Sequence, residues 1–86
     1  MRTLEELRRE IDVIDSGIVP LLVRRLALAG EIAAVKRAAG RPAEDPAREE
    51  SVLGSFAAAV PAGSLDAVRA VYRTLFREMK AAQSRV

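Results

Sequence analysis

Apolar residues recur every three or four positions along the first half of the chain, which is the spacing of one face of a helix. Thr3 and Glu6 have the spacing of a capping box that starts a helix, and Gly40 and Pro42 end the pattern. We therefore predict one long helix from about Thr3 to about Ala39. Its apolar stripe consists of Leu4, Leu7, Ile11, Ile14, Ile18, Leu21, Leu28, Ile32 and Val35.

Gly17 and Pro20 interrupt this helical pattern. Proline has no backbone N–H, so Pro20 removes one helical hydrogen bond and tends to kink the helix. We predict a single helix that bends near residues 16–20. The alternative is two helices that are broken there.

Two shorter helices are predicted after a loop over residues 40–44. Asp45 followed by Pro46 is typical of an N-cap and a first-turn proline, so a second helix is predicted from about Pro46 to about Ala59. Its inward side chains are Val52, Leu53 and Phe56. Pro61, Ala62 and Gly63 break this helix.

Ser64 is predicted to cap a third helix from about Leu65 to about Gln83. One stripe of this helix is apolar: Leu65, Val68, Val71, Leu75, Met79 and Ala82. No alternation typical of strands is present, so the predicted fold class is all-α, with three helices in a single domain over residues 1–86.

The predicted first helix is too long for the chain that follows it. At about 1.5 Å per residue it extends roughly 54 Å, and the two later helices together are about as long. So short a chain cannot cover the whole apolar stripe, and we therefore predict an intertwined homodimeric helical bundle. The alternative is a loose three-helix monomer.

Composition excludes several kinds of protein. The chain has no Cys and no His, so it has no disulfide, thiolate metal site, histidine-ligated metal or Ser–His triad. It has no apolar run long enough to span a membrane and no apolar signal segment near Met1, and we expect a cytoplasmic protein. The formal net charge of +2 and three aromatic residues disfavour nucleic-acid binding. We expect no cofactor and no metal.

Two cations occupy the apolar face of the first helix. Arg25 stands in the stripe between Leu21 and Leu28, where its charge is costly unless it meets an anion. Lys36 is eleven residues further on, within about 20° of the same face and about 16 Å along the axis. The pair can flank a small anion that carries carboxylates. The alternative is an ordinary surface role, or a salt bridge, for example with Glu49.

Further polar residues are predicted to join them. Asp45, Arg48 and Glu49 project from one side of the first turn of the second helix, where a cation such as Arg48 opposes the helix dipole. Gln83 continues the inward stripe of the third helix. Arg8 lies about 25 Å from Arg25 along the helix and roughly 100° around it, so it can reach the same ligand only from a second subunit. The alternative is that Arg8 is an ordinary surface residue with acidic neighbours.

Such a pocket has cations and an amide but no nucleophile and no base with a pKa near neutrality. It suits a reaction that needs only shape and electrostatics, in which a dianion is held in a reactive conformer and charge grows on an oxygen.

These residues resemble the all-helical, dimeric bacterial chorismate mutases of the AroQ type over nearly the whole chain. The resemblance is carried by residues 7–15, residues 21–25, residues 28–32 with Lys36, residues 41–42, residues 45–49 and Gln83. The ordered set at this spacing is specific, although no single piece is. The family implies a cofactor-free Claisen rearrangement of chorismate to prephenate, a step toward phenylalanine and tyrosine.

The resemblance also implies roles for individual residues. Arg25, and Arg8 from the partner subunit, bind carboxylates, and Arg48 supports one of them. Lys36 and Gln83 meet the ether oxygen whose bond breaks. Glu49 holds the ring hydroxyl, with help from Asp45.

Met79 departs from the family pattern, which has a small hydroxyl residue four positions before the glutamine. This departure leaves substrate affinity and identity open. The alternatives are a mutase for 4-amino-4-deoxychorismate, an isochorismate-pyruvate lyase on the same fold, or a non-catalytic helical regulatory partner. Glu49 favours chorismate over isochorismate, and an activator protein is a possible partner.

Overall fold

The computed structural model describes residues 1–84 of the chain and consists of three α-helices and one short 3-10 turn in that range. Helix α1 spans Leu4–Ala38, α2 spans Pro46–Ser55, the 3-10 turn spans Phe56–Ala58, and α3 spans Ala62–Ser84. The all-α prediction with a long first helix is confirmed. Arg85 and Val86, which belong to the predicted domain, lie outside the described residues.

Helix α1 starts and stops where the sequence predicts. The Thr3 hydroxyl accepts a hydrogen bond from the backbone N–H of Glu6 (3.1 Å) and donates one to its carboxylate (3.1 Å). At the other end, Gly40 adopts φ +67°, which is the left-handed conformation that favours glycine. The N–H groups of Gly40 and Arg41 then bond to the carbonyl oxygens of Arg37 and Lys36 (3.1 and 2.8 Å).

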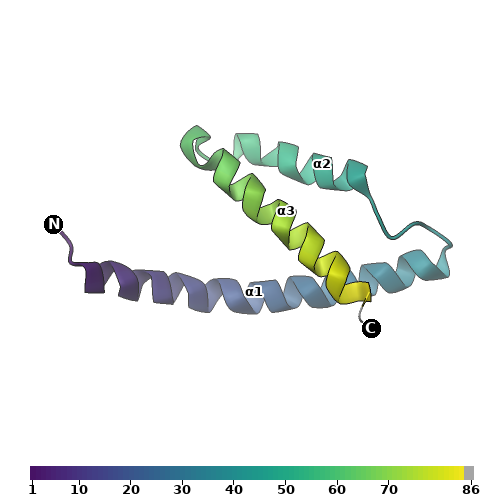
Figure 1. Cartoon of the computed structure of the whole chain (residues 1–86), viewed down its shortest axis with the longest axis horizontal. Helices are drawn as coiled ribbons and strands as arrows, with labels where there is room; N and C mark the ends of the chain where they lie inside the picture. The colour runs from purple at the N-terminus through teal and green to yellow at the C-terminus, as the bar shows by residue number, and fades with distance from the viewer. Residues whose placement is uncertain (85–86) are drawn as a thin grey trace.

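Pro20 does not divide α1. The helix is continuous through Pro20, and Figure 1 shows a gently curved rod with no break there. The Ser16 hydroxyl bonds to the carbonyl of Val13 (2.6 Å) within the same stretch. The alternative of two separate helices is therefore wrong, because one lost hydrogen bond does not outweigh the helical preference of the residues on both sides.

The start of α3 differs from the prediction. Ser64 is not its cap, since the helix already begins at Ala62 and includes Gly63. The carbonyl of Pro61 accepts from the N–H of Ser64 (2.9 Å), so the first turn closes directly on the proline. The fixed φ of proline suits the entry to a helix, and a glycine costs little in a first turn whose N–H groups have no helical partners.

The inward face of α3 also differs at one position. Val71 is 68% exposed, and Tyr72 faces inward in its place. The remaining members of the predicted stripe, Leu65, Val68, Leu75, Met79 and Ala82, are buried or half-buried, as are Val52, Leu53 and Phe56 of the preceding segment. The prediction of the inward face was therefore wrong by one residue at Val71, which corresponds to about 100° around the helix axis.

Helices α2 and α3 lie on one side of α1, and α3 slants down to meet the C-terminal half of α1 (Figure 1). The N-terminal half of α1 extends away from both, and every residue from 1 to 24 is exposed. Over the residues whose burial is described, 1–83, only Ala33 and Met79 are fully buried. Much of the apolar stripe of α1 is thus uncovered within one chain. No helix in residues 1–84 has the length and apolar character of a membrane span.

Candidate active site

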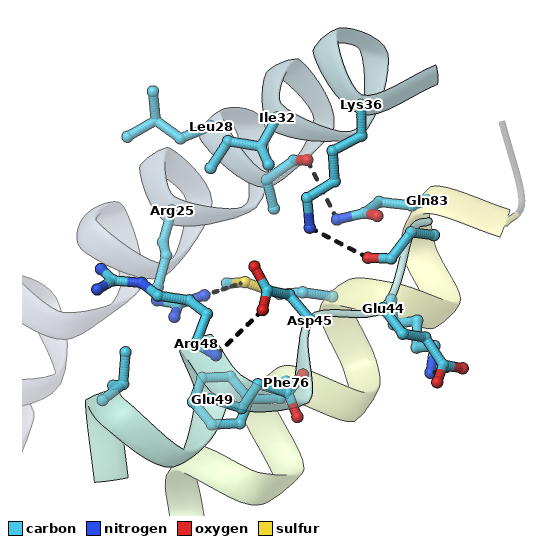
Figure 2. Close-up of a pocket in the computed structure, with 15 residues that line it drawn as sticks. Arg25, Leu28, Ile32, Lys36, Glu44, Asp45, Arg48, Glu49, Phe76 and Gln83 are labelled. Carbon is cyan, nitrogen blue, oxygen red and sulfur yellow. Dashed lines mark hydrogen bonds and ion pairs between the residues drawn. The ribbon is translucent and has the colours of Figure 1, made fainter. Parts of the chain in front are cut away.

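A cavity of about 330 Å³ lies between the C-terminal half of α1, the start of α2 and the C-terminal half of α3. Figure 2 shows side chains from all three helices around it. The cavity brings together most of the residues predicted from the sequence to bind a substrate: Arg25, Lys36, Asp45, Arg48, Glu49, Met79 and Gln83. In the view of Figure 2, Lys36 and Gln83 lie at one end and Arg25 and Arg48 toward the other.

Arg25 is half-buried and turns toward α3. Its Nη1 donates to the sulfur of Met79 (2.7 Å), and its guanidinium carbon lies 5.8 Å from the ring centre of Tyr72 and 5.7 Å from that of Phe76. The salt bridge with Glu49 that the sequence left open is not formed. The guanidinium is therefore held by a thioether and two aromatic rings.

Lys36 is placed by the end of α1. It lies in the last turn, and its carbonyl accepts the hydrogen bond from Arg41 that closes the helix. Its Nζ donates to the carbonyl oxygen of Ala43 in the loop that follows (3.2 Å). That partner is a neutral carbonyl, so no carboxylate offsets the charge of Lys36 in the cavity.

The start of α2 supplies a carboxylate, a guanidinium and a second carboxylate. Asp45 caps the helix, and its Oδ1 accepts from the backbone N–H of Arg48 (3.1 Å). The Arg48 side chain is not needed for that cap and reaches the cavity, as does Glu49. Asp45 therefore has a sufficient structural role, whereas the side chains of Arg48 and Glu49 remain available to a ligand.

Gln83 closes the cavity from α3. Its Nε2 donates to the carbonyl oxygen of Ala29 on α1 (3.1 Å). Met79, one turn earlier, is only 5% exposed. A methionine at this position is thus an internal partner of Arg25 and not merely an apolar wall.

The cavity has an excess of unpaired positive charge. In the described part of the chain, no carboxylate forms an ion pair with Arg25, Lys36 or Arg48. A fourth cation, Lys80, pairs with Glu44 at the rim, and this hydrogen bond and charge lower the pKa of Glu44 below its usual value of 4.5. Three cations thus face two carboxylates, Asp45 and Glu49, and the excess of positive charge favours an anionic ligand.

Arg8 is not brought to this cavity. It is exposed on the N-terminal half of α1 and does not line the pocket. The cavity is also lined by Phe76, Glu44 and Lys80, which the sequence pattern did not indicate. Phe76 lies seven residues before Gln83, and this helical spacing was the signal available for it.

This arrangement can bind and orient a small dianion and can place two donors, Lys36 and Gln83, near one of its oxygens. Such a cationic cavity, in an all-helical chain whose sequence has no Cys or His, suits chemistry that depends on positioning and electrostatics.

Comparison with known proteins identifies the family. The model of the chorismate mutase type II family matches residues 7–84, and the chain belongs to this family. It is 41% identical over 49 residues to the chorismate mutase of Methanocaldococcus jannaschii, a match that covers 57% of this chain and 50% of that protein. It is 36% identical over 80 residues to the T-protein of Haemophilus influenzae, covering 91% of this chain and 21% of that protein.

The fold agrees with that assignment. The solved structure of chorismate mutase (form II) from Thermus thermophilus has a TM-score of 0.87 and 29% identity, with 95% of this chain and 94% of that chain covered. The chain spans half of the length of the Methanocaldococcus relative and about a fifth of the T-protein.

Proposed function

We propose that the protein catalyses the Claisen rearrangement of chorismate to prephenate, a step of aromatic amino acid biosynthesis. The observation that carries this proposal is the cavity in which Arg25, Lys36 and Arg48 lie without carboxylate partners, beside the amide of Gln83. Membership of the chorismate mutase type II family supports it.

The reaction needs only what the cavity offers. One C–O bond of the ether breaks while a C–C bond forms within the same molecule, and no proton is transferred. The substrate is a dianion before and after, so Arg25 and Arg48 serve to bind its carboxylates in the reactive conformer. Negative charge grows on the ether oxygen, and a donor directed at that oxygen lowers the barrier.

Lys36 and Gln83 are the donors that we propose for the ether oxygen. They come from different helices and lie at the same end of the cavity (Figure 2). Lys36 has to exchange its bond with Ala43 for one with the substrate, whereas Gln83 has a second amide hydrogen free while the first remains on Ala29. We assign the ring hydroxyl to Glu49, supported by Asp45.

We further propose a homodimer in which Arg8 of each chain enters the cavity of the other. The exposed apolar face of α1 supports this, since Ile11, Ile14 and Leu21 are 55%, 53% and 63% exposed in one chain. Burying that face in a second copy provides the core that the single chain lacks. A cytoplasmic location is part of the same proposal.

The test is the loss of chorismate absorbance with the purified protein, with prephenate identified by NMR. Lys36→Ala should reduce kcat on the order of 10²–10³-fold, because it removes a donor to the developing charge. Arg37→Ala is the matched control, since it removes the neighbouring cation, which does not line the cavity. No turnover by a folded wild-type protein, or equal loss in both variants, rejects the proposal. Release of pyruvate from isochorismate, or turnover of 4-amino-4-deoxychorismate alone, would select the corresponding alternative.

A further inference from the structure

All the aromatic residues of the chain gather in one row that ends at Arg25. The sequence contains two Phe, one Tyr and no Trp. Phe56 meets Tyr72 edge to face, with ring centres 4.6 Å apart and planes at 78°, and Tyr72 meets Phe76 in the same way at 6.0 Å and 88°. Such pairs are favourable beyond the area they bury, so each ring restrains the next.

Arg25 contacts two of these rings, Tyr72 and Phe76. Its guanidinium lies 5.8 Å from the Tyr72 ring centre and 5.7 Å from that of Phe76, within the range of cation–π attraction. The sulfur of Met79 accepts a hydrogen bond from Nη1 of Arg25 (2.7 Å). Tyr72, Phe76 and Met79 are spaced by four and three residues, so they form one face of α3.

The chemical nature of these partners determines what Arg25 can do for a ligand. A carboxylate partner would hold the guanidinium firmly but would neutralise it, and a ligand carboxylate would then have to compete with it. Aromatic rings and a thioether restrain the group without cancelling its charge. Of the five N–H donors of a guanidinium, those not directed at Met79 stay available to an anion.

We propose that Phe76 and Met79, supported by Tyr72, are positioning residues that hold the Arg25 guanidinium in place for a substrate carboxylate. The inference rests on the proposed function in that Arg25 binds this carboxylate. It assigns to Met79 a role that its apolar character alone does not indicate. Phe56 belongs to the same row but contacts Tyr72 and not Arg25, so it serves as the internal control.

The kinetic test compares replacements of Phe76 and Met79, which contact Arg25, with a replacement of Phe56, which does not. The carboxylate that Arg25 binds keeps its charge from the ground state to the transition state, so looser positioning of Arg25 should raise KM more than it lowers kcat. Phe76→Leu and Met79→Leu should each raise KM for chorismate by about five- to tenfold. Phe76→Tyr, which keeps the ring, should raise KM less than Phe76→Leu does.

Phe56→Leu separates positioning from general packing. This variant loses a ring contact and stability, which thermal denaturation measures, but it leaves Phe76 and Met79 against Arg25. Its KM should stay within about twofold of wild type. An unchanged KM in both Phe76→Leu and Met79→Leu, or an equal rise in Phe56→Leu, overturns the inference.

A second readout requires no turnover. The Nε–Hε resonance of Arg25, assigned by its loss in Arg25→Lys, is shifted by the ring currents of Tyr72 and Phe76 and should move in Phe76→Leu more than in Phe56→Leu. If it moves while the wild type fails to convert chorismate, the proposed function is wrong and the positioning of Arg25 stands. If chorismate is converted but the resonance does not respond to Phe76→Leu, the positioning inference is wrong and the function stands.

Discussion

The side-chain amide of Gln83 donates to the carbonyl oxygen of Ala29 across the junction of α3 and α1, at 3.1 Å. Because a carbonyl oxygen only accepts, it requires the amide nitrogen, and not the amide oxygen, to face it. Ala29 thus fixes the orientation of Gln83, and the second hydrogen of the same nitrogen stays available to a ligand in the cavity.

Gln83→Glu should make kcat dependent on pH. At neutral pH the carboxylate has no hydrogen to donate and repels both the Ala29 oxygen and the developing charge on the ether oxygen, so kcat should fall on the order of 10²–10³-fold. Protonation restores one O–H donor, and activity should recover as the pH falls below about 5. The measurement is kcat against pH.

Gln83→Leu is the control for this experiment, because it removes the donor without introducing a group that titrates. It should be as slow as Gln83→Glu at neutral pH and should show no recovery in acid relative to wild type. Recovery in both variants would mean that Gln83 does not act as the donor.

Gly40→Ala should destabilise the protein. Gly40 adopts φ +67°, and no atom lies within 4 Å of the position where a Cβ would be, so the cost is one of backbone conformation and not of a clash. About 1–2 kcal/mol is expected, which corresponds to a melting temperature lowered by about 4–8 °C per kcal/mol. The measurement is thermal denaturation at fixed protein concentration.

Gly54→Ala should change the stability in the opposite direction. Gly54 lies within α2, also with no atom within 4 Å of its Cβ position. Alanine is the better residue inside a helix, by about 0.5–1 kcal/mol, so this variant should be more stable. A similar drop in both variants would show that the left-handed turn at Gly40 is not the cause.

The ion pair between Glu44 and Lys80 predicts how stability changes in acid. Lys80 lowers the pKa of Glu44, so the folded protein holds this carboxylate ionised more strongly than the unfolded chain does. The stabilisation is therefore complete above the usual pKa of 4.5 and is lost as the pH falls through the lower folded value.

Glu44→Gln should accordingly lower the melting temperature by a small constant amount above about pH 5, and the difference from wild type should close in stronger acid. Both groups are exposed, so added salt should also reduce the difference. Glu50→Gln, a change of equal charge at an exposed residue of α2, is the control. A difference that grows in acid would contradict the argument.

Much of the cavity is predictable from the sequence because it depends on local geometry. The helical period alone places Lys36 on the face of Arg25, and the cap at Asp45 directs Arg48 and Glu49 to one side of α2. The partners of Arg25 are not predictable in this way. They depend on where α3 crosses α1, and the one-residue error at Val71 concealed that Tyr72 faces inward.

Arg8 provides the test of the shared cavity. If Arg8 enters the cavity of the partner, Arg8→Ala and Arg25→Ala homodimers each lack one carboxylate ligand at both sites and should be nearly inactive. A heterodimer of the two has one site with both arginines and one with neither. Mixing under subunit exchange should therefore restore about a quarter of the wild-type activity, since about half of the dimers are mixed and half of their sites are intact.

The control replaces Arg25→Ala in the mixture with the Arg8→Ala/Arg25→Ala double variant. No combination of that chain with Arg8→Ala contains a site with both arginines, so mixing should restore nothing. The Arg8→Ala and Arg25→Ala chains have equal mass, so the Arg8→Ala chain is labelled with ¹⁵N in both mixtures, and native mass spectrometry then shows whether exchange has occurred. If exchange is complete and the first mixture remains inactive, Arg8 does not cross between subunits. In that case the cations within one chain have to bind both carboxylates by themselves.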